Sequence, residues 1–138
     1  MSAYLLDTNV ISELRKPKPH GGVVRWVGSL RDDQIFISVV TLGELQRGVE
    51  RTRRQDAVKA REIEQWVNHL EESVNVLAMD AQCFREWARL MEKKSIHLLE
   101  DAMIAATARV RGLQVATPNE RDFAPFDVTT FNPFHVTS

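Results

Sequence analysis

Four acidic side chains are spaced along the chain so that they could act on one metal ion. Asp7 follows a short apolar run, Glu44 comes shortly after a second apolar run, and Asp101 stands near the start of an alanine-rich segment. Asp122 is a candidate for a fourth position. Two unit charges 4 Å apart repel by about 4 kcal/mol at an effective dielectric constant near 20, so grouped carboxylates need a cation among them. We therefore expect Asp7, Glu44 and Asp101 to hold a divalent ion.

The ligand chemistry favours magnesium. An all-oxygen set of ligands selects Mg²⁺, or Mn²⁺ in its place, over zinc or copper. Such an ion activates water and stabilises the charge that develops when a phosphodiester is cleaved. A zinc hydrolase is not indicated, because the chain has one cysteine, Cys83, and no H-x-x-x-H pair among its four histidines. The candidates to support the carboxylates are Thr8, Asn9, Thr41 and Asn119.

Each acidic residue also has a structural explanation. Residues 41–44 match a capping box in which Glu44 reaches back to a helix start. Asp7 could cap a short helix that begins near Asn9, and Asp101 would be favourable near a helix N-terminus. Asp122 could be a turn residue. The functional interpretation is favoured because all four positions fall at one end of the sheet that the apolar residues predict.

The pattern of apolar residues predicts strands that alternate with helices. The predicted strands are 4–6, 35–40, 74–77, 113–116 and 128–131. The predicted helices are 22–30, 42–49, 58–70, a segment capped by Asp80 that runs to Met91, and 99–110. Residues 17–22 are predicted to be a loop. This order predicts an α/β fold with a mostly parallel sheet of about five strands and helices on both faces. Ligands of such sheets bind outside the carboxyl ends of the strands.

The composition agrees with one compact domain over residues 1–138. The hydrophobic fraction is 43% and the charged fraction is 27%, which is typical of neither a disordered nor a membrane protein. No apolar run approaches the roughly 20 residues of a membrane span, and residues 1–7 do not resemble a signal peptide. The single cysteine excludes an intramolecular disulfide. We expect a cytoplasmic protein.

The net charge is −1, so the overall balance does not indicate a nucleic-acid partner. Residues 47–61, however, carry six basic side chains and only two acidic ones, Glu50 and Asp56. The basic residues are Arg47, Arg51, Arg53, Arg54, Lys59 and Arg61. This local excess could bind phosphates, or it could be a pair of solvated helices.

Taken together, the motifs resemble those of PIN-domain ribonucleases. Residues 5–10 (LLDTNV) resemble the opening motif, 38–45 (SVVTLGEL) the second acidic motif and 100–108 (EDAMIAATA) the third. Residues 117–123 (TPNERDF), followed by 131–134 (FNPF), resemble the closing segment. Their order and spacing cover nearly the whole chain. Residues 7–13 (DTNVISE) are most similar to VapC-type toxins of toxin–antitoxin pairs, in the FitB-like branch.

The resemblance implies a PIN fold and an endoribonuclease that depends on Mg²⁺ or Mn²⁺ and cuts RNA. It implies a homodimer that a small antitoxin inhibits, with the complex bound to promoter DNA. Asp7, Glu44 and Asp101 carry over as the acidic site. Many members have Thr-Arg-Asp or Thr-Arg-Asn where this chain has Thr117-Pro118-Asn119. The fourth position therefore falls to Asn119 or to Asp122, and the number of metal ions, one or two, stays open.

A response-regulator receiver would need a lysine after a late strand, and the segment after Ala116 has none. Two other classes of protein compete with the ribonuclease interpretation. A phosphatase of the haloacid-dehalogenase kind would need a second aspartate two residues after Asp7, where this chain has Asn9. A catalytically silent PIN module that acts only by binding an antitoxin-like partner is favoured by Pro118 and opposed by the intact acidic set. That second alternative stays open at this point.

Overall fold

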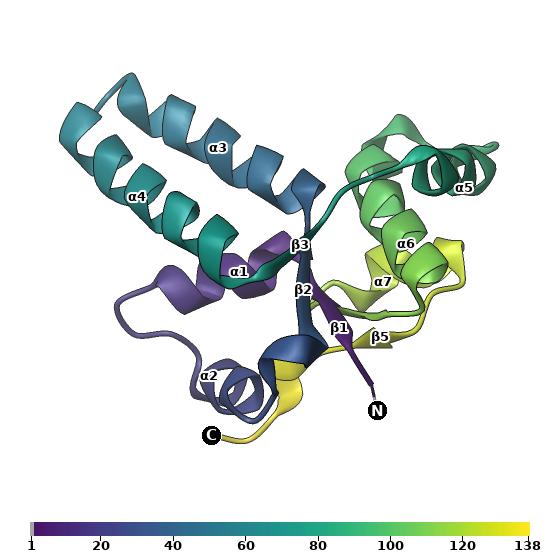
Figure 1. Ribbon diagram of the computed structural model, residues 1–138, viewed down its shortest axis with the longest axis horizontal. Helices are drawn as coiled ribbons and strands as arrows, with labels where there is room; N and C mark the ends of the chain where they lie inside the picture. Colours follow the sequence, from purple (N-terminus) through teal and green to yellow (C-terminus); the bar gives the residue numbers. More distant parts are fainter. Residues whose placement is uncertain (1) are drawn as a thin grey trace.

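The computed structural model describes residues 2–138, and a five-stranded sheet forms its centre (Figure 1). All strand pairs are parallel, and the strand order is β3-β2-β1-β4-β5. The strands are β1 (Tyr4–Leu6), β2 (Ile35–Ser38), β3 (Asn75–Leu77), β4 (Gln114–Ala116) and β5 (Thr130–Phe131). The predicted α/β fold with about five parallel strands is confirmed.

Within residues 2–138, seven α-helices connect and cover the strands. They are α1 (Thr8–Arg15), α2 (Gly21–Gly28), α3 (Val39–Arg53), α4 (Ala57–Ser73), α5 (Ala81–Met91), α6 (Leu99–Arg111) and the short α7 (Glu120–Phe123). No helix within residues 2–138 is both long enough and apolar enough to cross a membrane. Asp80 caps α5 as predicted, because its carboxylate accepts a hydrogen bond of 3.0 Å from the backbone N–H of Cys83.

The alternation of side chains along β1 explains the two layers of helices. Leu5 is fully buried on the face that α5 and α6 cover, in a core with Ile104 of α6. Leu6 is buried on the opposite face, where α1 and α2 contribute Val10 and Trp26. Because successive side chains of a strand point to opposite faces, a short β1 supplies both cores. The helices therefore lie on both faces of the sheet, as predicted.

Helices α3 and α4 form an antiparallel hairpin with a core of its own, made by Val49, Ala60 and Val67. Figure 1 shows that this hairpin extends away from the sheet, on the side opposite to α5 and α6. Trp66 of α4 packs against both this core and the core below α1 and α2. The hairpin is thus anchored to the sheet at its base.

The start of α3 differs from the sequence prediction. Val39 and Val40 were assigned to a strand because they are β-branched, yet the helix begins at Val39. The hydroxyl of Ser38 caps it by accepting a hydrogen bond of 3.0 Å from the N–H of Val40. Thr41 therefore lies inside the first turn, fully buried, so the predicted capping box from Thr41 to Glu44 is wrong.

The predicted loop at residues 17–22 also ends earlier than expected, because α2 begins at Gly21. The Nδ1 atom of His20 accepts hydrogen bonds from the N–H groups of Gly22 and Val23, at 3.1 and 3.3 Å. A histidine is not among the residues that usually cap helices, which is why the sequence pattern did not reveal this start. Gly22 also allows the C-terminal segment to approach, since an added Cβ would lie 1.9 Å from the carbonyl oxygen of Val136.

We predict opposite effects for two glycine-to-alanine substitutions within α2. Gly22→Ala forces a methyl group against the rigid backbone of Val136 and should lower the free energy of unfolding by about 1–3 kcal/mol. Gly28→Ala meets no atom within 4 Å and should be neutral or stabilising by up to about 1 kcal/mol. Urea unfolding curves of the two variants and the wild type measure the difference. Equal stabilities for the two variants would contradict the close contact.

Candidate metal centre

The acidic residues approach one another at the carboxyl edge of the sheet. Asp7 directly follows β1, Glu44 lies in the second turn of the helix that follows β2, and Thr117 directly follows β4. These three strands are neighbours in the sheet and run parallel, so their carboxyl ends meet on one side. In Figure 1 this edge faces the space between the α3–α4 hairpin and the pair α5–α6.

Asp7 is both a helix cap and the most enclosed carboxylate of the group. Its side chain is 5% exposed. One carboxylate oxygen accepts a hydrogen bond of 2.8 Å from the N–H of Thr8, and the other accepts one of 2.8 Å from the hydroxyl of Thr117. Burial raises the pKa of Asp7 above its ordinary value, while these two hydrogen bonds oppose the rise and the charge of Asp122 adds to it.

Glu44 is tied to the same place through two threonines. The hydroxyl of Thr8 donates a hydrogen bond of 2.8 Å to Glu44 Oε1 and lies 3.0 Å from the hydroxyl of Thr41. Because Thr8 has one proton and gives it to Glu44, Thr41 must donate to Thr8. Burial, together with the nearby Glu100 and Asp7, raises the pKa of Glu44 to about 7, although the hydrogen bond from Thr8 opposes the rise.

Asp101 stands in the first turn of α6, as predicted, and is half-buried. Burial, and after it the charges of Asp7, Asp122 and Glu100, together raise the pKa of Asp101 to about 6. Asp122, in the short helix α7, thus lies close enough to act on both Asp7 and Asp101. The structure brings all four predicted carboxylates into one electrostatically coupled group.

Two members of this group were missed by sequence reasoning. Glu100 lies close enough to Glu44 to raise the pKa of that carboxyl, and it forms an ion pair of 3.0 Å with Arg47. It stands beside Asp101 in the third motif, which was the available signal. Thr117 is fully buried and donates to Asp7; its position directly after β4 was the signal.

The four predicted supporting residues differ in what they contribute. Thr8 and Thr41 form the hydroxyl chain to Glu44. Asn119 offers its backbone N–H, which donates a hydrogen bond of 3.0 Å to the hydroxyl of Thr117. Asn9 is exposed, and its side chain makes no hydrogen bond to another residue of the described chain. A supporting role for Asn9 therefore stays a prediction.

The carboxylate oxygens of this group are suitable ligands for a hard dication, although they do not yet surround a common position. Among residues 2–138, no three acidic, histidine or cysteine side chains stand close enough to hold one ion as they are placed. The group nevertheless consists of carboxylates whose protonated forms are favoured by burial and by one another. A dication relieves the same repulsion that protonation relieves. The residues present therefore fit Mg²⁺ in chemistry.

A groove with basic walls opens beside Glu44. It has a volume of about 340 Å³ and lies between α1, α3 and α4, with Thr8 and Glu44 at one end. Arg15, Arg47 and Arg51 line it, together with apolar side chains of α4. This groove connects the acidic edge of the sheet to cations that attract phosphates.

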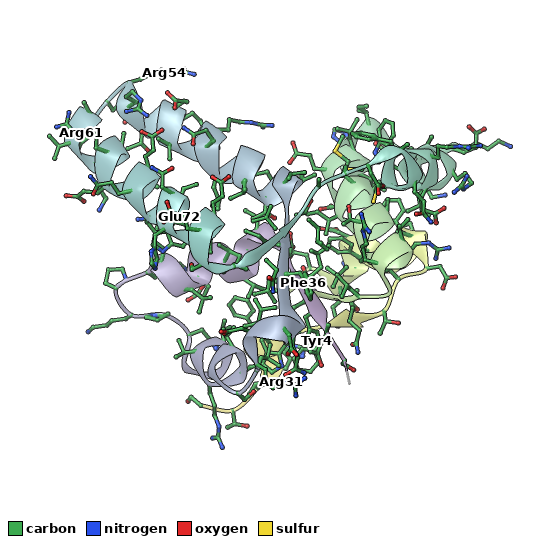
Figure 2. The ribbon with its side chains drawn as sticks, in the orientation of Figure 1. Tyr4, Arg31, Phe36, Arg54, Arg61 and Glu72 are labelled. Carbon is green, nitrogen blue, oxygen red and sulfur yellow. The ribbon has the colours of Figure 1, made fainter. Side chains whose placement is uncertain are left out.

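Some basic residues of the stretch 47–61 are placed to bind phosphates, and others are solvated residues of the hairpin. Arg47 and Arg51 line the groove, as phosphate binding requires. Arg53 instead forms exposed ion pairs with Glu50 and Glu64 on the hairpin. Figure 2 shows Arg54 and Arg61 at the far tip of the hairpin, away from the sheet. Only the part of the stretch nearest the sheet can act at the acidic site.

The fold is an α/β domain with a parallel five-stranded sheet. Its acidic site lies at the edge of the sheet where the central strands have their carboxyl ends. The PIN domain family model matches residues 4–128. The chain belongs to the PIN domain family.

Similar proteins narrow this assignment. The chain is 35% identical over 144 residues to "Toxin FitB" of Neisseria gonorrhoeae, covering 95% of this chain and 98% of that protein. It is 38% identical over 133 residues to "VapC ribonuclease Y4jK" of Sinorhizobium fredii, with 89% of each chain covered. The structure of FitAB bound to the IR36 DNA fragment superposes with a TM-score of 0.76 and 32% identity, over 98% of both chains. The resemblance to VapC-type toxins of the FitB-like branch is thereby confirmed.

The raised pKa of Glu44 predicts how stability depends on pH when no metal is present. Folded Glu44 keeps its proton up to about pH 7, whereas the unfolded chain releases it near pH 4.3. The free energy of unfolding should therefore fall as the pH rises through this window. Because the side chain is only half-buried, the contribution is on the order of 1 kcal/mol. Glu44→Gln should reduce the slope of stability against pH between pH 5 and 7 in EDTA.

Glu50→Gln is the matched control. A hydrogen bond from Arg53 holds the pKa of Glu50 below its usual range, so Glu50 titrates below this window and its replacement should leave the slope unchanged. Thermal melts at several pH values measure both slopes. If Glu44→Gln keeps the wild-type slope, the carboxyl of Glu44 is not coupled to burial and its acidic neighbours.

Proposed function

We propose that this chain is an Mg²⁺-dependent endoribonuclease, with Mn²⁺ as an alternative ion, that acts as the toxin of a toxin–antitoxin pair. The observation that carries the proposal is the coupling of Asp7, Glu44 and Asp101 at the carboxyl edge of the sheet, with the pKa values of all three raised. A relative is named a VapC ribonuclease and another a toxin, which supports the reaction and the biological class.

In the proposed reaction, Asp7, Glu44 and Asp101 would hold the metal ion, and Asp122 is the candidate for a fourth ligand. The ion supplies an activated water and stabilises charge on the leaving oxygen. Thr117 and the N–H of Thr8 fix both oxygens of Asp7. Fixed carboxylates lose little freedom when the ion binds, which is the physical basis of preorganised catalysis.

The basic groove offers a path for the RNA backbone. Arg15 and Arg51 make no ion pair with another residue of the described chain, and both line the groove that ends at Glu44. Arginine binds phosphates without reading sequence. The groove would hold one side of the strand while a phosphodiester lies at the carboxylates.

The proposed partners follow from the same relatives. We propose that a small antitoxin inhibits the chain, that two copies form a homodimer, and that the complex with antitoxin binds promoter DNA. The structure of FitAB bound to a DNA fragment supports the last of these. A cytoplasmic location is proposed with them, since the RNA substrate and the promoter are found there.

Two observations favour the alternative, a catalytically silent module that only binds its partner. Pro118 stands where related motifs carry arginine, and the acidic side chains would have to move to surround an ion. The coupled carboxylates argue more strongly for catalysis, since a binding module has no need of acidic groups that repel one another within the protein.

The test is cleavage of a mixed RNA pool by the purified chain with Mg²⁺, with Mn²⁺ and with EDTA. We predict cleavage in either metal and none in EDTA. Asp7→Asn should reduce the rate by at least about 100-fold, because it removes a charged ligand. Asp56→Asn is the matched control: Asp56 also caps a helix, α4, by accepting from the N–H of Lys59, and asparagine caps helices as well as aspartate does.

Equal cleavage in EDTA and in metal would contradict the metal mechanism. No cleavage under any metal by a folded protein, combined with growth arrest that persists in Asp7→Asn, would support the silent module instead.

A further inference from the structure

A second cavity adjoins the acidic site on the side away from the basic groove. It has a volume of about 380 Å³ and is lined by Ile96, His97, Leu99, Glu100 and Asp101. It lies at the turn that joins α5 to α6, where residues Ile96–Leu98 form a 3₁₀ helix. Because Glu100 and Asp101 form part of its wall, whatever occupies it lies against the carboxylate group.

Two side chains in this cavity have no structural use in the chain. Ile96 is 70% exposed, more than the other large hydrophobic residues that stand exposed in residues 2–138. The imidazole of His97 is exposed as well and makes no hydrogen bond or ion pair to another described residue. An apolar side chain and an aromatic ring are thus presented to solvent side by side.

The backbone beneath them is held in place. The hydroxyl of Ser95 caps the 3₁₀ helix by accepting from the N–H of His97 at 3.3 Å. The indole N–H of Trp87 donates to the carbonyl oxygen of Leu99 at 3.3 Å. Leu98 packs into the core below α5 and α6. The turn therefore presents Ile96 and His97 from a fixed support.

The charges nearby limit what can bind here. Lys93 and Lys94 directly precede the turn, are exposed, and form no ion pair within residues 2–138. Glu100 and Asp101 close the other side. A phosphate beside the lysines and an uncharged aromatic group against Ile96 and His97 would match this surface, whereas an acidic peptide would meet Glu100 and Asp101.

We propose that this cavity receives one unpaired nucleobase of the RNA, next to the phosphodiester at the carboxylates, with the base stacked on His97 and covered by Ile96. Histidine is among the side chains on which unpaired RNA bases stack. The inference rests on the proposed ribonuclease function and adds to it: the cavity selects single-stranded RNA and biases the base on one side of the cut.

The test compares wild type with His97→Ala, His97→Phe and Ile96→Ser on short single-stranded RNAs in Mn²⁺. His97→Ala should raise KM about tenfold, as expected when a base loses an aromatic partner, with kcat changed much less. His97→Phe keeps a stacking surface and should restore KM. Ile96→Ser should raise KM by about threefold or more. Matched controls are His69→Ala and Val58→Ser, which replace an exposed histidine and an exposed valine on α4.

A second measurement maps the bases on both sides of each cut in a mixed RNA pool. The wild type should show a preference at one neighbouring position, which His97→Ala loses and both control variants keep. Light scattering of Ile96→Ser should give the same mass as wild type.

The outcomes separate the two proposals. A wild type that cleaves no RNA contradicts the proposed function and this inference with it. A wild type that cleaves, with the same KM and base preference in His97→Ala, contradicts the inference alone. A lower mass for Ile96→Ser also contradicts it, because the surface would then be a contact between two copies of the chain.

Discussion

The near-complete burial of one carboxylate, Asp7, is the constraint on which the rest of the site depends. An ionised carboxylate inside a protein is costly unless hydrogen bonds or a cation compensate it. Here the N–H of Thr8 and the hydroxyl of Thr117 each supply one hydrogen bond. These donors come from α1 and from the end of β4, so the pairing of β1 with β4 is what holds Asp7 in position. The charge that remains uncompensated is what makes the site suitable for a metal ion.

The same constraint organises the surroundings of the site. Thr8 links Asp7 to Glu44, since its backbone N–H donates to the first and its hydroxyl to the second. Burial and the nearby carboxylate of Glu100 in turn raise the pKa of Glu44. The basic groove adjoins Glu44, and the cavity at the α5–α6 turn adjoins Asp101. The acidic group therefore lies between the groove proposed to bind phosphates and the cavity proposed to bind a base.

Much of this arrangement could be predicted from the sequence, for physical reasons. The spacing of apolar residues along the chain indicates which side chains are buried. This local pattern was enough to predict the parallel sheet and to place Asp7 and Asp101 at its edge. The start of α3 did not, because β-branched Val39 and Val40 favour a strand locally and only the Ser38 cap makes them helical. Thr117 and Glu100 were missed because their roles depend on contacts with residues far away in the chain. The sequence pattern predicts the helices and strands, whereas contacts between residues distant in the sequence are seen only in the three-dimensional structure.

If the carboxylates share one metal site, protons and a dication compete for it. The most direct measurement is a pH titration of the side-chain carboxyl carbons by ¹³C NMR, without metal and with saturating Mg²⁺. Without metal, Glu44 should titrate near pH 7 and Asp101 near pH 6. With Mg²⁺, both midpoints should fall by more than one pH unit. Midpoints near pH 4 for both groups, unchanged by Mg²⁺, would contradict a shared metal site.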